Sequence, residues 1–457
     1  MDRLPENLLY MVSQISNYSK NTVKIQTLNQ TTLAPSGGAS QLRLSLPVNA
    51  LVNMKSLALH GTFSTKGVDE SAANAKDKVF ALIPKNGFAS VIDRLTFSAG
   101  GIALDSGFSG YNVVSTMKEN IEKSAAKYMS DDKVLNQSIL ESIDETGTYE
   151  AANFGQQKQL ILANFLGFSG CEPTFLDLNR LPEVFLTIQV TSASVLPVQY
   201  EGAVLGGAAV NANPNFSGNG CSYTIDNIFF TIEVISIGNG LYDALTSRLL
   251  EEKGSLDVPY KNFNTFTTDQ SSAGGSIRGS VSTMSLDKVF AFQRNSAKKT
   301  DGSPYEQYYI QQAPVPAVGN TTFGFTNAGL NFISSGLQDW FFQINNAPYP
   351  LYKPDTVDAY AYAVASCDRQ YSKYRGSLVG SQATWKDNCW VAVQKLNHDD
   401  DPRLISGLNL ASINSQISFT STSNNTQAEN WERQVWLVTE STSMLRIGAS
   451  RSIAVVA

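Results

Sequence analysis

The chain has 457 residues, which exceeds the size at which one hydrophobic core keeps growing, so two domains are expected. Hydrophobic residues make up 42% of the chain, which excludes wholesale disorder, while charged residues make up 16%, below the roughly 25% of an average soluble domain. The formal net charge of -6 gives no basic footprint, so direct binding to nucleic acid, sequence-specific or not, is not expected.

Residues 1–20 form an N-terminal arm ahead of the first strand. Its Leu8, Met11, Val12 and Ile15 fall on one side of a short amphipathic helix, which suits an arm that clasps a neighbouring copy or touches an inner membrane. The apolar run in this arm is too short for a signal peptide, and it lacks a basic n-region. No stretch of the sequence approaches the ~18 apolar residues of a membrane span.

Strand patterns dominate the first half of the chain. Alternating apolar and polar residues predict strands over 21–33, 41–48, 54–64 and 91–104, the last with an Ala-Gly-Gly turn. A helix is predicted over 111–129, where Val114, Met117, Ile121 and Ala125 form one apolar stripe.

The stretch NRLPEVFLTIQV (179–190) carries the clearest alternation in this half. Val184, Leu186, Ile188 and Val190 fall on one sheet face, so one side of the strand belongs to a core. A Gly-, Ala- and Asn-rich loop (201–220) and a long strand (223–237) follow.

A Gly-Asn-Gly turn (238–240) opens a second predicted helix (241–254), after which strand patterns resume. Residues 295–325 read as a long surface loop, and 339–352 as two strands around an Asn-Asn-Ala-Pro turn. Residues 357–367 are ambiguous, but their alanines favour a short helix. The remaining predicted strands are 256–268, 275–284, 287–294, 388–396, 412–420, 433–440 and 451–456.

The order of elements suggests a duplicated chain. At an offset of 229 positions, Pro173, Leu176, Leu181, Val184, Ile188 and Val190 fall on Pro402, Ile405, Leu410, Ile413, Ile417 and Phe419. Two all-β domains of about 200 residues with inserted helices fit jelly rolls better than immunoglobulin-type sandwiches of ~100 residues. The expected fold is therefore all-β with a few inserted helices: two tandem eight-stranded jelly-roll sandwiches. The expected division is an N-terminal arm (1–20), a first jelly roll (21–237), a connecting turn and helix (238–254) and a second jelly roll (255–457).

Residues able to do chemistry are few, and none of their arrangements predicts a reaction. The two histidines, His60 and His398, lie in different halves, and no Gly-x-Ser-x-Gly elbow accompanies them. The run HDDD (398–401) is the best metal candidate, yet it lacks the spacing of a calcium loop and reads better as an acidic turn ended by Pro402. SDDK (130–133) reads as a charged loop. The Gly-Asn-Gly turn lacks the third glycine of a dinucleotide site, because position 243 is Asp.

The cysteines and aromatic residues also favour structural roles. Without a Cys-x-x-Cys pair, the thiols are expected to be buried and reduced: Cys171, Cys221, Cys367 and Cys389. The five tryptophans all lie in the second half, where Trp340 and Trp436 sit in apolar strands and are expected in the core. YEQYY (305–309) reads as an exposed contact patch. The Asn-x-Ser/Thr triplets are attributed to chance: Asn17, Asn29, Asn136, Asn215, Asn320 and Asn424. The sequence therefore predicts no enzyme and no catalytic, cofactor-binding or metal-binding residues.

Four passages taken in order carry a family likeness. They are NTVKIQTLNQTTLAP, FLGFSGCEPTFLDLNRLPEVFLTIQV, YTIDNIFFTIEVISIGNGLYDALTSRLLEEKGSLDVPYKNFNTF and FFQINNAPYPLY. Together they resemble the double jelly-roll major capsid proteins of the polinton-like virus and virophage group, through most of the chain and most weakly in the loops.

The resemblance implies a homotrimeric, pseudo-hexagonal capsomer that tiles an icosahedral shell around double-stranded DNA, within a virion assembled inside the host cell. It also implies a penton protein and minor or cement proteins as partners. The alternative is a β-sandwich carbohydrate-binding or receptor-binding surface protein, which would present exposed Trp and Tyr on one concave face. A jelly-roll hydrolase is a weaker alternative, because the two histidines are isolated.

Overall fold

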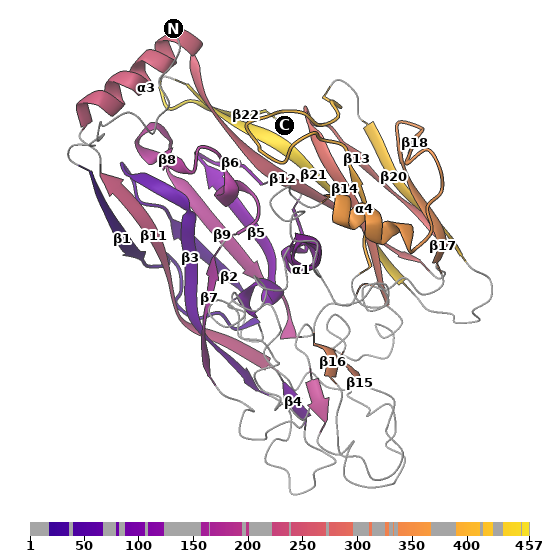
Figure 1. The fold of residues 1–457 in the computed structure, drawn as a ribbon. Coiled ribbons are helices and arrows are strands. Elements are labelled where there is room, and N and C mark those ends of the chain that lie inside the picture. Colours follow the sequence, from indigo (N-terminus) through magenta and orange to yellow (C-terminus); the bar gives the residue numbers. More distant parts are fainter. Residues whose placement is uncertain are drawn as a thin grey trace, which may run out of the picture.

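The computed structural model shows two β-sandwiches side by side (Figure 1). It describes residues 18–35, 40–66, 79–81, 87–105, 108–122, 157–163, 165–193, 198–200, 222–236, 239–270, 274–295, 310–312, 325–328, 332, 337–366, 390–411, 415–423, 433–448 and 450–456. Five expected features lie outside these residues: most of the N-terminal arm, the last part of the first predicted helix (123–129), the charged loop 130–133, the loop 201–220 and the YEQYY patch.

The first sandwich is built from residues 19–236. One sheet has the order β1-β11-β3-β7 and the other has the order β2-β9-β5-β6, with every neighbouring pair antiparallel. The short strand β8 (Phe175–Asp177) adds to β3. The strands are β1 (Ser19–Ile25), β2 (Gln41–Ser45), β3 (Leu51–Lys66), β5 (Ile92–Ala99), β6 (Ile102–Ala103), β7 (Lys158–Ala163), β9 (Val184–Val190) and β11 (Ser222–Ser236).

The second sandwich is built from residues 255–456 and repeats this plan. One sheet has the order β12-β21-β14-β19, with β22 (Ile453–Val456) added to β21, and the other has the order β13-β20-β17-β18. The strands are β12 (Ser255–Gln270), β13 (Gly275–Val281), β14 (Leu286–Asn295), β17 (Leu337–Ile344), β18 (Ala347–Tyr349), β19 (Ala392–Lys395), β20 (Ser415–Ser423) and β21 (Arg433–Gly448).

The two sandwiches have the same topology, strand for strand. In each, the eight main strands pass back and forth between the two sheets and pair in the same spatial order, which is the jelly-roll arrangement. Strand β9 in the first corresponds to β20 in the second, as the 229-position offset predicts. Ile188 and Val190 and their counterparts Ile417 and Phe419 are all buried, whereas Leu176 is buried and its counterpart Ile405 is exposed.

The alternation read from residues 184–190 is confirmed by β9. Its four aliphatic side chains are buried, while Phe185, Thr187 and Gln189 are half-buried or exposed. The same period of two gives β3 and β11 one dry face and one wetter face. The core therefore lies between the two sheets of each sandwich.

Three α-helices join these strands in the described part of the chain. Helix α1 (Tyr111–Glu122) links β6 to β7, and α4 (Asp358–Ser366) links β18 to β19, so the two occupy equivalent positions. Helix α3 (Asn239–Lys253) connects the sandwiches. The strands flanking α3, β11 and β12, belong to different antiparallel sheets, so no parallel βαβ unit surrounds the Gly-Asn-Gly turn. No described helix is long and apolar enough to cross a membrane.

Two tight turns match their sequence signals. Gly100 and Gly101 have positive φ between β5 and β6, and Asn345 and Asn346 have positive φ between β17 and β18. Such left-handed conformations are typical of two-residue hairpins and favour Gly and Asn.

One expectation needs correction. Within 295–325, predicted as a loop without regular structure, residues Ile310–Gln312 form β15, which pairs with β16 (Phe325–Ala328). A second small sheet joins β4 (Val79–Ala81) to β10 (Val198–Tyr200). Strands of three or four residues are too short for their periodicity to be read from sequence.

Candidate functional site: the interface between the two sandwiches

Helix α1 lies between the two sandwiches (Figure 1). Its side chains from Tyr111 to Lys118 are all buried, as is Ile121. Gly110, which precedes the helix, has a φ of +66°, and a Cβ there would lie 2.5 Å from the Trp436 ring on β21. Only glycine permits both this backbone conformation and this close approach. The start of α1 is thus fitted to the second sandwich.

A buried ion pair crosses the interface. Lys118 Nζ on α1 lies 2.8 Å from Glu440 Oε2 on β21, with both side chains less than 10% exposed. The ammonium group also lies 5.8 Å from the ring centre of Phe263 and 5.6 Å from that of Phe290. Burial alone would raise the pKa of Glu440, but the nearby cations Lys118, Lys288 and Lys261 outweigh it and lower the pKa to about 2. Glu440 is therefore ionised at neutral pH.

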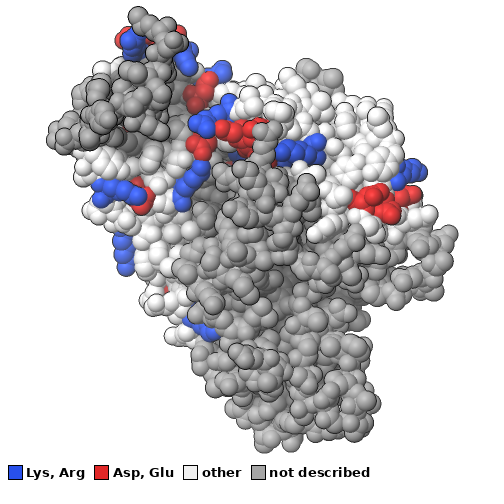
Figure 2. All heavy atoms as spheres, viewed as in Figure 1, with Lys and Arg blue, Asp and Glu red and all other residues white. Residues whose placement is uncertain are grey.

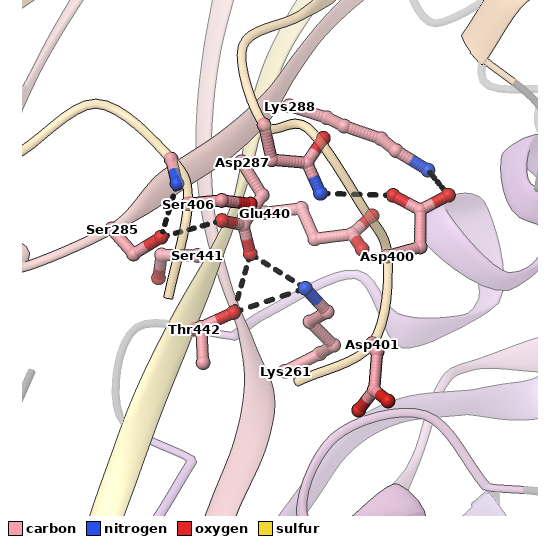
Figure 3. Close-up of polar contacts among 12 residues, drawn as sticks. Lys261, Ser285, Asp287, Lys288, Asp400, Asp401, Ser406, Glu440, Ser441 and Thr442 are labelled. Atoms are coloured by element: carbon pink, nitrogen blue, oxygen red, sulfur yellow. Dashed lines mark hydrogen bonds and ion pairs between the residues drawn. The ribbon is translucent and has the colours of Figure 1, made fainter. Parts of the chain in front are cut away.

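Behind this pair, hydrogen bonds tie β12, β14 and β21 together (Figure 3). Lys261 Nζ donates to Asp287 Oδ2 at 2.7 Å and to Thr442 Oγ1 at 3.0 Å, and the Thr442 hydroxyl donates to the same carboxylate at 2.6 Å. Ser285 Oγ donates to Asp287 Oδ1 at 2.7 Å and accepts from Gly407 N at 3.0 Å. Both oxygens of the buried Asp287 carboxylate therefore have donors.

The acidic turn 398–401 closes the other side of this group. Asp400 accepts from Lys288 Nζ at 3.0 Å and from Asn397 Nδ2 at 2.9 Å, while Asp401 pairs with Arg403 at 2.7 Å. Asp400 departs from the expected solvated turn, because it points inward to Lys288 (Figure 3). Both carboxylates are occupied by cations of this chain. No group of three potential metal ligands occurs among the described residues.

Neutral contacts complete the interface. The Tyr260 hydroxyl on β12 donates to Leu104 O at 2.7 Å, Thr265 Oγ1 donates to Ser109 O at 3.0 Å, and Glu172 N donates to Pro259 O at 2.9 Å. Aromatic rings pack across it as well, with centres 5.2 Å apart for both Phe108–Phe263 and Phe168–Tyr260. Apolar packing with satisfied polar groups holds the two sandwiches in one orientation.

Asp105 lies buried in the first sandwich directly beside this interface. Its carboxylate accepts from Phe168 N at 3.1 Å and from Phe97 N at 3.4 Å. Burial raises the pKa of Asp105 to about 7, against the opposing effect of these two hydrogen bonds.

The two histidines do not come together. His60, on β3, is half-buried, stacks on Phe229 at 4.7 Å and lies 2.9 Å from Thr231 Oγ1. His398 is exposed on the acidic turn. The two histidines therefore lie in different sandwiches and do not form a common site.

The described tryptophans Trp340, Trp390 and Trp436 are buried, which confirms the expected core positions of Trp340 and Trp436. They offer no exposed platform of the kind that a carbohydrate-binding face requires. Trp385 and Trp431 lie outside the described residues.

Cys171 and Asn29 are the described residues among the cysteines and the Asn-x-Ser/Thr triplets, and both have structural contacts. Cys171 is a buried free thiol, and burial raises its pKa to about 12. Asn29 donates through Nδ2 to Gln41 O and accepts from Arg43 N, so its amide fastens the segment before β2. The other cysteines, Cys221, Cys367 and Cys389, lie outside the described residues, as do Asn17, Asn136, Asn215, Asn320 and Asn424.

Sequence reasoning missed the Lys118–Glu440 pair. The only available signals were a lysine directly beside the apolar stripe of α1 and a glutamate at the end of the strand RQVWLVTE. The pair is separated by 322 positions, which no local pattern can connect.

Solved structures similar to the whole chain are viral. VP54 of PBCV-1, fitted into a cryo-EM reconstruction of the virophage Sputnik, is 12% identical, with 98% of this chain and 99% of that chain covered and a TM-score of 0.60. The Faustovirus major capsid protein is 11% identical, with 98% and 93% covered and a TM-score of 0.58. A cryo-EM structure of Sputnik itself is 10% identical, with 100% and 92% covered and a TM-score of 0.56.

No protein-family model and no curated protein matches the sequence. At these identities the structural similarity shows the fold, which is the double jelly roll expected from the sequence.

Proposed function

We propose that this chain is a viral major capsid protein of the double jelly-roll type, whose function is geometric rather than catalytic. The observation that carries the proposal is the interface built around α1, where both faces of β14 and β21 are buried. It makes one rigid block of two jelly rolls. The likeness to the Faustovirus major capsid protein along 98% of the chain supports the same conclusion.

In this proposal three chains form a homotrimer. Each contributes a first jelly roll (21–237) and a second (255–457), joined by the turn and helix 238–254, so six similar sandwiches make a pseudo-hexagonal capsomer. Their shared topology supports this, because similar domains can take similar places around a ring. Such capsomers would tile an icosahedral shell around double-stranded DNA in a virion assembled inside the host cell.

The sandwiches would stand roughly perpendicular to the shell, with loops 201–220 and 295–325 at the crown and the arm 1–20 beneath. The proposed partners are other copies of the chain, a penton protein and minor or cement proteins. The arm is a candidate for contact with an inner membrane. Among the described residues on the face drawn in Figure 2, charged side chains lie in small mixed groups, which suits contact between identical copies.

Light scattering and negative-stain microscopy of the purified full-length protein test the proposal. We expect a mass near three chains and three-fold blocks with a hexagonal outline. A monomer at every concentration, with no tendency to assemble, would overturn it.

A further inference from the structure

In the second sandwich, strands β14 and β21 of the β12-β21-β14-β19 sheet are covered on both faces. Among the described residues, the equivalent β1-β11-β3-β7 sheet of the first sandwich is covered on one face only. In β14, the side chains from Leu286 to Gln293 are all buried, and in β21 those from Val435 to Ser443 are buried. The equivalent strands of the first sandwich, β3 and β11, alternate instead, with Phe229, Thr231 and Glu233 of β11 only half-buried. Strand β1 at the sheet edge is exposed from Ser19 to Lys24.

The equivalent helices α1 and α4 also differ in burial: α1 is covered on all sides over its described residues, and α4 has an exposed face. All the described side chains of α1 are buried between the two sandwiches, whereas in α4 Ala359 and Ala363 are buried and Ala361 and Ala365 are exposed. The segment just before α4 is more exposed still, with Leu351 at 91%, Tyr352 at 53% and Val357 at 44% exposure. Three large apolar side chains close together in the chain are thus left in solvent.

We propose that α4 and the preceding segment 351–357 of one copy pack onto the outer face of the β1-β11-β3-β7 sheet of a second copy. The contact repeats between molecules what α1 makes with the β12-β21-β14-β19 sheet within one molecule. This inference rests on the proposed function and adds the two surfaces that meet. The contact is head to tail, because it joins two different surfaces and can close into a ring.

The chemistry of the two surfaces is complementary. On the sheet, Lys24 Nζ lies 4.0 Å above the Phe229 ring, which also stacks on His60. These groups form a platform of aromatic faces and cations. On the helix side, Asp355 is exposed and Asp358 half-exposed at the start of α4, beside the apolar segment. Lys20 is already paired with Glu233 at 2.7 Å, so the carboxylates can meet Lys24 while the apolar side chains cover the rings.

The sheet lies where such a contact is accessible. Strand β1 runs along the side of the first sandwich that faces away from the second sandwich (Figure 1). As far as the described residues show, the intramolecular interface therefore leaves this edge uncovered.

Light scattering on surface variants of the full chain tests the proposal. Leu351→Arg and Ala361→Arg replace apolar contact residues by cations opposite Lys24. Both positions are exposed, so the melting temperature should stay within about 2 °C of wild type. We expect the double variant to be monomeric at a concentration where wild type is trimeric. Leu404→Arg is the matched control, because Leu404 is 49% exposed and belongs to neither proposed surface. This variant should assemble normally.

Cysteine cross-linking identifies the partner surface. Thr22 is exposed on β1 and shares a face with Lys20 and Lys24. We expect Thr22→Cys combined with Ala361→Cys to form disulfide-linked oligomers on mild oxidation, and neither single variant to do so.

The outcomes separate the two proposals. A monomeric wild-type chain overturns the proposed function. If the wild type is trimeric, the proposed function stands. The inference is then overturned if the double arginine variant also assembles and the cysteine pair does not cross-link.

Discussion

Replacing Lys118 by methionine should destabilise the protein by about 3 kcal/mol. Breaking a buried ion pair by removing one partner costs about 3–5 kcal/mol, because the remaining charge is left without compensation. The lower end applies here, since Lys288 and Lys261 still act on Glu440. The lowered pKa of Glu440 agrees with this in direction, because the neighbouring lysines hold the buried carboxylate in its ionised form.

The double variant Lys118→Met with Glu440→Leu should recover most of this loss. Both side chains would then be apolar beside Phe263 and Phe290, and apolar replacements of buried ion pairs are often neutral. The control is Arg248→Gln, which breaks an exposed pair with Glu252 and should cost less than ~0.5 kcal/mol.

Urea unfolding, followed by tryptophan fluorescence at fixed protein concentration, measures these differences. The pH dependence supplies a second readout. Because the folded-state pKa of Glu440 is depressed, its contribution is present above about pH 4.5 and is lost as the pH falls towards 2. Lys118→Met should weaken that acid-side loss. If Lys118→Met unfolds at the wild-type urea concentration, or the double variant is less stable than the single, the reasoning is refuted.

Two further variants test the packing and the buried carboxyl beside the interface. Gly110→Ala should lower the melting temperature by several degrees, because the new Cβ meets the Trp436 ring and the φ of +66° is strained for alanine; an unchanged melting temperature would contradict the close fit. The folded-state pKa of Asp105 is raised from 3.8 to about 7, so its contribution to stability is present below about pH 4 and is lost as the pH rises through 7. Melting curves of Asp105→Asn should therefore lack the part of the decline between pH 4 and 7 that wild type shows, and an identical profile would argue against a neutral Asp105.

The jelly rolls could be predicted from the sequence because several first-half strands have one buried face and one wetter face. The alternation in β9 and β11 is the signature of a sheet with one buried face. The Gly-Gly and Asn-Asn pairs mark the β5–β6 and β17–β18 hairpins. In the second half, β14 and β21 lose that alternation because a second surface covers them. The sequence DKVFAFQR shows a strand but not what lies on its outer side.

The interface itself could not be predicted. Its contacts join residues such as Tyr260 and Leu104, which lie 156 positions apart, and one of the two atoms is a backbone carbonyl. Local sequence predicts a solvated acidic turn because it shows the carboxylates but not Lys288, which comes 112 positions earlier than Asp400. Long-range pairing depends on topology, which local patterns do not encode.

The interval of 322 positions between Lys118 and Glu440 has a consequence for biosynthesis. Helix α1 leaves the ribosome long before β21, so the growing chain carries an unprotected helix face until nearly all of the second sandwich has been made. A prematurely terminated chain would lack β21 and could not cover α1, so the interface also distinguishes finished chains from unfinished ones.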